Sequence, residues 1–146
     1  MSLRCVYLIV DNLFEIVEES DERYRCYTVS IPIQIFKNIM KGEKLEEVRI
    51  YVSTDFHLRT IQNTIESYIR WFTVCETVLR NYYENELGER VDKDWFNEIK
   101  VYTVDITFNS ADDYGATITC GDNLLLDHIL IINVDREQIE SIHLNG

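Results

Sequence analysis

The fold is decided by residues 56–87, FHLRTIQNTIESYIRWFTVCETVLRNYYENEL, a stretch without proline or glycine that stops at Gly88. Its apolar residues recur at steps of three and four, and they are Ile61, Ile65, Tyr68, Phe72, Cys75, Leu79 and Tyr82. This spacing predicts one continuous stripe on an amphipathic α-helix. Thr54 or Asp55 can cap its first turn, and Gly88 is the expected left-handed stop. We therefore expect one long helix within residues 55–88.

The sequence on either side of this helix predicts β-strands. Before it, the β-branched and aromatic residues favour strands at residues 3–10, 13–17, 23–33 and 48–52, with two turns of helix at 34–40. After it, a short helix is expected at 92–98. The hydrophobic period then switches to two, which predicts four strands at residues 100–108, 114–120, 127–134 and 138–144. Because short polar links join these four strands, they should form an antiparallel meander.

These elements predict a single α+β domain over residues 1–146. It consists of a mostly antiparallel β-sheet packed against one long α-helix and ends in a C-terminal β-meander. A chain of 146 residues has the size of one domain, and 46% hydrophobic with 27% charged residues is typical of a globular protein. We find no internal repeat and no linker that would divide the chain.

The length of the expected helix bears on assembly. Thirty helical residues would measure roughly 45 Å, so one end, near Tyr82, Tyr83 and Leu87, should overhang the sheet. We expect Trp95 and Phe96 to cover that end within the same chain. The alternative is that the overhang packs against a second copy, so the protein is either a monomer or a homodimer.

Charge is the strongest compositional feature. The formal net charge is −12, and it is uneven: residues 1–83 hold 12 acids and 10 bases, whereas residues 84–146 hold 14 acids and 4 bases. Nucleic acid and anionic membrane surfaces need a basic footprint, so neither is an expected partner. A basic protein partner fits, because complementary fields speed association. The plainer explanation of the charge is solubility.

The N-terminus and the cysteines predict a cytoplasmic protein. No apolar run approaches the roughly 20 residues that span a bilayer, and the first ten residues read as a strand rather than as a signal peptide. Four cysteines occur, with no Cys-x-x-Cys spacing. We expect them to be reduced and mostly buried. A disulfide between Cys5 and Cys26 is the alternative.

No cofactor is predicted, because the glycine-rich phosphate loops and the common metalloprotease and hydrolase motifs are absent from the sequence. One constellation of oxygen ligands lies at the turns of the meander: Asp112, Asp113, Asp122, Asn123, Asp127 and His128. If alternate turns met at one end of the sheet, these groups could hold a hard divalent cation. The commoner explanation is that Asp and Asn occupy turns because their side chains bond the local backbone. We therefore assign no metal ligand.

The histidines give no catalytic assignment. Asp127 and His128 are adjacent in a predicted strand, so their side chains should point to opposite faces and make a poor dyad. His57 falls in the first turn of the predicted helix, where a capping role is expected. The residues that we select for partner binding are instead the acids of the turns and one neighbouring aromatic residue: Asp112, Asp113, Asp122, Asp127 and Tyr114.

The C-terminal third resembles small bacterial proteins that contain a domain of unknown function. The segments that carry this resemblance are Asp94-Trp95-Phe96, Ile106-Thr107-Phe108-Asn109, Asp113-Tyr114-Gly115-Ala116-Thr117-Ile118 and Leu126-Asp127-His128-Ile129-Leu130-Ile131. Some similar proteins resemble immunity proteins that neutralise toxins. The resemblance thus implies a binding function that suits an acidic surface.

Charge and resemblance together favour an acidic, soluble, non-enzymatic protein-binding module that engages a basic partner, in the manner of an immunity protein. Two alternatives remain at the level of sequence. The first is a metal-dependent hydrolase that uses the turn carboxylates to activate water. The second is a structural subunit whose only chemistry is packing.

Overall fold

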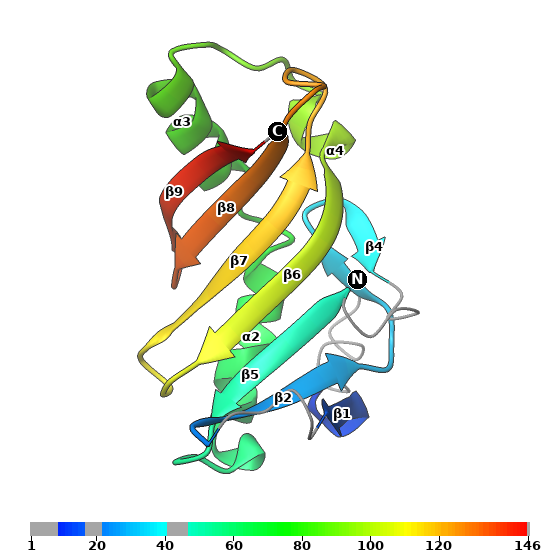
Figure 1. The fold of residues 1–146 in the computed structure, drawn as a ribbon, viewed down its shortest axis with the longest axis vertical. Helices are drawn as coiled ribbons and strands as arrows, with labels where there is room; N and C mark the ends of the chain where they lie inside the picture. Colours follow the sequence, from blue (N-terminus) through cyan, green and yellow to red (C-terminus); the bar gives the residue numbers. More distant parts are fainter. Residues whose placement is uncertain (1–8, 17–21, 41–46, 146) are drawn as a thin grey trace.

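The computed structural model describes residues 9–16, 22–40 and 47–145. Its main feature is a seven-stranded sheet with the order β1-β2-β5-β6-β7-β8-β9 (Figure 1). The strands are β1 (Leu13–Ile16), β2 (Tyr24–Val29), β5 (Val48–Ser53), β6 (Lys100–Phe108), β7 (Tyr114–Gly121), β8 (Ile129–Asp135) and β9 (Gln138–Asn145). Neighbouring strands are antiparallel except β5 and β6, which run parallel. The predicted α+β class with a mostly antiparallel sheet is confirmed, as is the C-terminal meander.

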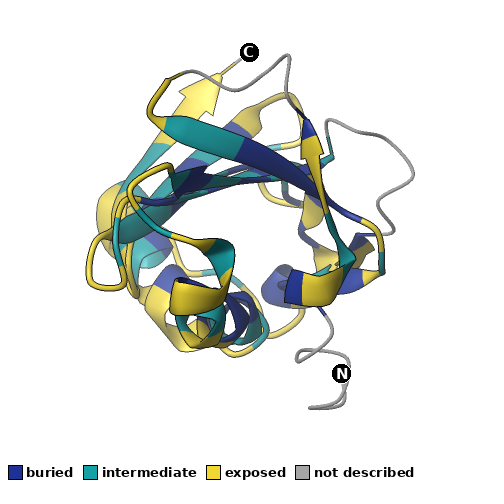
Figure 2. Ribbon diagram, turned by 90° about the horizontal axis from the view of Figure 1, so that it is seen from below, coloured by how far each residue is buried: buried dark blue, intermediate teal, exposed yellow. Residues whose placement is uncertain are grey.

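The one parallel pair follows from the connection between its strands. Parallel neighbours need a crossover of at least about a dozen residues, and residues 54–99 supply it. This crossover contains η3 (Leu58–Ile61), α2 (Gln62–Trp71), α3 (Glu76–Leu87) and α4 (Trp95–Glu98). Viewed from one end, the sheet arches over the helices (Figure 2).

The strands alternate between a buried face and an open face. Buried side chains from the central strands point toward the helices, and they include Val48, Ile50, Val52, Val104, Ile106, Phe108, Ile118, Cys120, Leu130 and Ile132. Ile65, Tyr68, Ile69, Leu79 and Tyr83 meet them from α2 and α3. The intervening strand residues are mostly polar and lie on the other side of the sheet, which we call the open face. An antiparallel sheet with one packed face and one solvated face produces this alternation.

The single long helix that we predicted is wrong. The chain forms two helices, α2 and α3, separated by residues 72–75. The apolar stripe is nevertheless buried on both sides of the break. Its buried residues are Ile61, Ile65, Tyr68, Phe72, Cys75 and Leu79. Its last member changes, because Tyr83 is buried and Tyr82 is only half-buried.

A contact with a distant segment explains the break. The backbone N–H of Phe36 donates to the carbonyl of Phe72 at 3.0 Å, so this carbonyl accepts from outside the helix. The next amides close short turns instead: Thr73 N–H donates to Arg70 at 3.0 Å, and Val74 N–H donates to Trp71 at 3.0 Å. The hydroxyl of Thr73 adds a bond to the Arg70 carbonyl at 2.7 Å. The helix therefore ends at Trp71 and restarts after Cys75.

The segment that makes this contact was also predicted wrongly. Residues 34–40, expected as helix, form a hairpin of β3 (Ile33–Ile35) and β4 (Asn38–Met40). Phe36 turns the hairpin with a positive φ of 54°, and its ring lies 5.3 Å from that of Phe96. Asn38 joins the hairpin to β6, because its side chain donates to the Ile99 carbonyl at 2.8 Å and accepts from Val101 N–H at 3.1 Å. Tertiary contacts thus override a weak local helix pattern.

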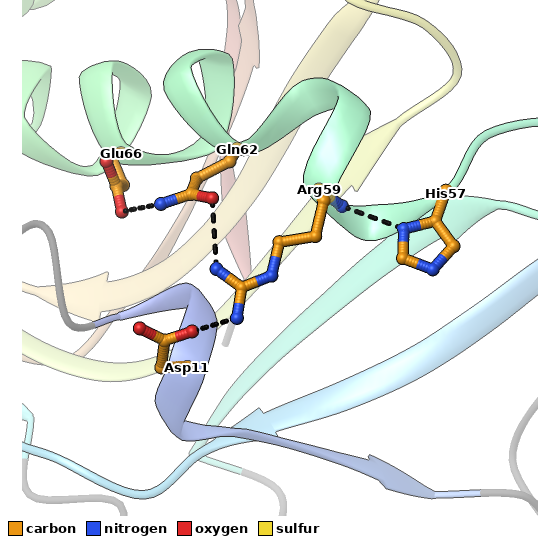
Figure 3. Close-up of polar contacts among 5 residues, drawn as sticks. All are labelled: Asp11, His57, Arg59, Gln62 and Glu66. Carbon is orange, nitrogen blue, oxygen red and sulfur yellow. Dashed lines mark hydrogen bonds and ion pairs between the residues drawn. The ribbon is translucent and has the colours of Figure 1, made fainter.

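The first helical turn is capped by His57 rather than by Thr54 or Asp55. His57 Nδ1 accepts the backbone N–H of Arg59 at 3.2 Å. The Arg59 guanidinium then donates to Gln62 at 3.1 Å and pairs with Asp11, and Gln62 donates to Glu66 at 3.2 Å (Figure 3). This chain of contacts joins the start of the helical region to η1 (Val10–Asn12). The capping role expected for His57 is confirmed.

Gly88 ends α3 as predicted, with φ of 69° in the left-handed region. The ring of Trp95 covers the end of this helix, since it lies 4.7 Å from that of Tyr83. Phe96 is also fully buried. Leu87, which was also expected at the overhanging end, is partly buried against the core.

The remaining strand predictions hold with shifted bounds. The strand expected at 23–33 ends at Val29, and the one expected at 127–134 begins at Ile129. The strand expected at 3–10 falls mostly outside the described residues, and its described end is not a strand, because Ile9 lies in a turn and Val10 begins η1. Within those residues, no helix combines the length and the apolar character that crossing a bilayer requires.

Candidate functional site

A row of polar residues crosses the open face from β5 to β9. Strand register places these side chains opposite one another in the order Arg49, Asp105, Thr117, Asn133 and Ser141. Neighbours in a sheet on one face lie close enough to bond. The row therefore presents a continuous polar surface across five neighbouring strands rather than scattered groups.

Hydrogen bonds join most members of this row. Arg49 Nε pairs with Asp105 Oδ1 at 2.9 Å. Thr117 donates from Oγ1 to Asn133 Oδ1 at 3.0 Å, and Asn133 Nδ2 donates to Ser141 Oγ at 3.0 Å. These bonds fix the side chains without covering them, since all five residues are half-buried.

A hollow of about 330 Å³ lies beside this row, over the ends of β6, β7 and β8. Four of its lining residues are acids, namely Asp105, Asp113, Asp135 and Glu140, and we call this concave surface the acidic hollow. Its other lining residues are neutral. Two arginines lie at its margin. Arg49 pairs with Asp105, and the exposed Arg136 lies 3.6 Å from Asp135. Among the described residues, the other two acids of the hollow, Asp113 and Glu140, have no ion pair and are left for a ligand.

Gly115 keeps the floor of the hollow low. A Cβ atom at this position would lie 2.5 Å from the carbonyl oxygen of Val134 on β8. Because backbone cannot move aside as a flexible side chain can, the close approach of β7 and β8 requires glycine here. The glycine lies between Thr107 on β6 and Asp135 on β8, so no side chain fills the lining at this position.

The structure brings two of the five predicted binding residues to this hollow. Asp113 and Tyr114 line it, and Asp112 is exposed in the adjoining turn. The ring of Tyr114 packs against Tyr68 at 4.7 Å, in an edge-on geometry, and lies 5.6 Å from the ring of Phe108. Tyr114 is thus an extension of the core rather than an aromatic anchor on the open face.

Asp122 occupies a different environment from the one we expected. It is 8% exposed, and its Oδ2 accepts from Tyr83 at 2.7 Å and from Trp95 Nε1 at 2.8 Å. Its Oδ1 accepts the backbone N–H groups of Leu124 at 3.3 Å and Leu125 at 2.9 Å. Four donors therefore fill this carboxylate, which leaves no face of it for a partner.

The Asp122 contacts also act on Tyr83. Burial, followed by the hydrogen bond to Asp122, raises the pKa of the Tyr83 hydroxyl above its ordinary value. A neutral phenol that donates to a buried carboxylate is stable, whereas a second negative charge there would not be. Asp122 is therefore a structural residue that joins α3 and α4 to the loop after β7.

Asp127 is exposed but lies far from the hollow. It belongs to the connection between β7 and β8, whereas Asp112 and Asp113 belong to the turn between β6 and β7. The two connections lie at opposite ends of β7 (Figure 1). Eight residues of strand separate them by roughly 25 Å.

The turn carboxylates therefore do not converge. No group of three or more His, Cys, Asp or Glu side chains in the described parts of the chain is arranged to hold a metal ion. The cation site considered from the sequence needed alternate turns at one end of the sheet. The turn that does share the end of Asp113 is the one after Asp135, which the sequence constellation did not include.

One serine–histidine pair appears that sequence reasoning missed. Ser141 Oγ lies 3.2 Å from His143 Nε2 on β9. Residues two apart in a strand share a face, so the spacing Ser-x-His was the available signal. A nucleophile of this kind also needs a third group to orient the histidine. Among the hydrogen bonds of the described residues, His143 makes only the one to Ser141. The pair has the contacts of a polar surface rather than those of a catalytic site.

The buried cysteines are unreactive. Cys26, Cys75 and Cys120 form no disulfide with one another, and Cys5 lies outside the described residues. Burial raises the pKa of Cys75 and of Cys120 to about 12 in each case. Since the thiolate is the nucleophilic form, neither side chain is poised for covalent chemistry.

The residues that the sequence did not single out are Asp105, Asp135 and Glu140. Their signal was present in part, because strand alternation places Asp105 on the polar face of its strand. The predicted meander makes β6 to β9 neighbours, but the strand register that brings Asp135 and Glu140 beside Asp105 could not be read from the sequence. Comparison with protein-family models, curated proteins and solved structures gives no match.

Proposed function

We propose that this protein is a non-enzymatic binding module whose acidic hollow engages a basic segment of another protein. The observation that carries the proposal is the lining of the hollow, in which four carboxylates share one concave part of the open face and the two arginines, Arg49 and Arg136, lie only at its margin. A concave acidic surface of this kind favours lysine or arginine side chains.

The position of the hollow supports this proposal. It lies on the solvated face of the sheet, beside polar residues that hydrogen bonds already hold in place. Ordered side chains lose little conformational freedom when a partner binds, which preserves affinity. The excess of acids in residues 84–146 extends the attraction beyond the hollow and would speed encounter with a basic partner.

The alternatives gain less support. The hydrolase hypothesis relied on a meeting of turn carboxylates, and those groups lie at opposite ends of β7. The subunit hypothesis has no observation that favours it over binding at the hollow. We extend the proposal to the class of partner: the resemblance of the C-terminal third to immunity-like proteins makes a basic toxin domain the partner to test first. We also propose that the protein acts in the cytoplasm, as its buried, unbridged cysteines suit a reducing compartment.

The test compares two variants of equal charge. In the first, Asp113→Asn, Asp135→Asn and Glu140→Gln neutralise three acids of the hollow. In the matched control, Glu86→Gln, Glu89→Gln and Asp127→Asn neutralise three exposed acids elsewhere. The probe is a synthetic ten-residue lysine-rich peptide, and its affinity is measured by fluorescence anisotropy at several salt concentrations.

We expect the hollow variant to bind about tenfold more weakly than the unaltered protein, which corresponds to about 1.4 kcal/mol. Its affinity should also depend less on salt, because fewer exposed charges are left to screen. The control should change affinity less than about twofold if the hollow is the site. Equal weakening by both variants would show that net charge alone attracts the peptide, and would refute a localised site.

A further inference from the structure

The backbone of β9 presents a defined set of hydrogen-bonding groups at the edge of the sheet. The phase of the ladder is set by Arg136, whose N–H donates to the Tyr114 carbonyl at 2.9 Å across β7 and β8. In an antiparallel pair, hydrogen-bonded and non-bonded residue pairs alternate. The Gly115–Asp135 pair is thus non-bonded, and the backbone groups of Asp135 point toward β9.

The same alternation continues along β8 to its partner. Asn133 and Ile131 lie two and four residues before Asp135, so their backbone groups also point toward β9. Their register partners are Ser141 and His143. The backbone N–H and C=O groups of Ser141 and His143 therefore bond to β8. The backbone groups of Ile142 and Leu144 point away from the sheet.

A side chain occupies the other outward position on this edge. The hydroxyl of Tyr82 on α3 donates to the carbonyl of Glu140 at 3.1 Å. Glu140 is the extra residue of a β-bulge, because Asn133 pairs with Ser141 and Val134 pairs with Ile139. The bond from Tyr82 shows that the carbonyl of Glu140 also faces outward. Among the described contacts, the outward N–H and C=O groups of Ile142 and Leu144 have no partner.

We propose that β9 pairs with β9 of a second copy, antiparallel about a two-fold axis at His143. In this register Ile142 lies opposite Leu144 of the partner subunit, and the two residues exchange both backbone hydrogen bonds. The two-fold axis repeats the exchange, so four bonds form. A register centred on Ile142 would place Leu144 opposite Glu140, whose carbonyl Tyr82 already holds. Of these two registers, the one centred on His143 uses only backbone groups that have no partner in the described contacts.

The side chains of this edge suit a second copy better than a basic partner. Residues 138–145 contain one acid, Glu140, although the whole chain has a net charge of −12. The proposed register places Ile142 and Leu144 side by side across the axis, and Leu144 is 43% exposed in the single chain. Exposed edges with unpaired backbone groups commonly join other strands. The opposite edge, β1, has only four residues.

This inference does not rest on binding at the acidic hollow. Added salt distinguishes the two interactions, because it should affect them in opposite directions. Two chains of like charge repel, so salt should strengthen pairing between copies. The same salt should weaken attraction between the hollow and a lysine-rich peptide. Pairing between copies can therefore be refuted while peptide binding at the hollow is confirmed, and the reverse.

Cysteine cross-linking tests the register directly. In the proposed dimer the two copies of residue 143 form a non-bonded pair with Cα atoms about 4.5 Å apart, which is within the range for a disulfide. Residue 141 lies two positions from the axis, so its two copies are separated by more than about 13 Å. The variants are His143→Cys and the control Ser141→Cys, each with Cys5→Ser to remove a cysteine that the structure does not describe.

Under a mild oxidant, we expect His143→Cys to form a cross-linked species of twice the 17.3 kDa chain mass. Ser141→Cys should cross-link at least tenfold more slowly. Equal rates for the two variants, or no cross-linking of His143→Cys at high protein concentration, would overturn the proposal.

Sedimentation of the protein without cysteine substitutions gives a second test. Its average mass should rise with protein concentration and with added sodium chloride. Ile142→Pro removes only an outward N–H and leaves the ladder to β8 intact, so this variant should keep its circular dichroism spectrum and sediment as a monomer. A dimer that survives in the folded Ile142→Pro variant would exclude pairing through this edge.

Discussion

At the scale of single residues, Asp122 shows how far local sequence can mislead. Gly121-Asp122-Asn123 has the composition of a surface turn, and its acid does bond the two following amides as a turn residue should. Its other partners, Tyr83 and Trp95, lie 39 and 27 residues earlier in the chain. No local sequence pattern indicates that such distant residues will donate to Asp122, so its burial could not be predicted.

The Asp122 contacts predict a large loss of stability in Asp122→Ala. This change leaves the Tyr83 hydroxyl and the Trp95 indole N–H buried without an acceptor, so it should cost about 3 kcal/mol of unfolding free energy. Asp122→Asn keeps one acceptor oxygen and should cost about half as much. Urea denaturation measures both, with exposed Asp127→Asn as a control that should change stability by less than about 0.5 kcal/mol. A loss in Asp122→Ala as small as the control's would contradict a structural role.

The two buried thiols predict a loss of stability at alkaline pH. The pKa of Cys75 and of Cys120 is about 12 in the folded chain, against 9.0 in an unperturbed thiol. Their contribution to stability is complete below pH 9, and it falls between pH 9 and 12 because the unfolded chain releases the protons first. Each thiol should remove about 1.4 kcal/mol per pH unit in that window. Cys75→Ala should reduce this slope in urea titrations at pH 8.5 to 10.5, and an unchanged slope would count against the assignment.

At the scale of elements, sequence periodicity predicted which residues are buried, whereas a tertiary contact decides where the helix ends. The three-and-four stripe from Ile61 to Leu79 predicted burial correctly, because amphipathic spacing records which side chains meet the core. It could not predict the break at residues 72–75. That break depends on the carbonyl of Phe72, which accepts from Phe36 in a hairpin 36 residues earlier.

The acidic hollow was predictable only in part for the same reason. Period-two patterns located β6 to β9, and the turn acid Asp113, which was selected from the sequence, lines the hollow. Asp135 and Glu140 join it because β7, β8 and β9 are neighbours in the sheet. The meander predicted that these strands are neighbours, but it did not predict their register, which decides which side chains lie opposite one another.

The two glycines of β7 give a matched prediction for this sheet. Gly115→Ala places a methyl group 2.5 Å from the backbone carbonyl of Val134, so it should cost about 1–3 kcal/mol. Gly121→Ala meets only the hydroxyl end of the Tyr102 side chain at 3.1 Å, which can rotate away. Thermal unfolding should therefore show a clearly lower Tm for Gly115→Ala than for Gly121→Ala. Equal Tm values would refute the close approach of β7 and β8 at Gly115.

At the scale of the whole molecule, the sheet separates two kinds of surface. One face packs on the helices and gives the fold, whereas the open face carries the polar row and the acidic hollow. The central claim is that the hollow, rather than the acidic character of the whole chain, recognises a basic partner. It predicts binding confined to one end of the open face.

The most direct test is a ¹⁵N–¹H NMR titration of the protein with the lysine-rich peptide. We predict that the largest shift changes fall on backbone amides near the acidic hollow, within residues 105–117 and 133–140. Amides of residues 84–98, which are also rich in acids, should shift little, because the hollow at Glu98 contains one acid of this segment and is also lined by Lys100. Shift changes spread evenly over both acidic regions, or confined to residues 84–98, would contradict the account.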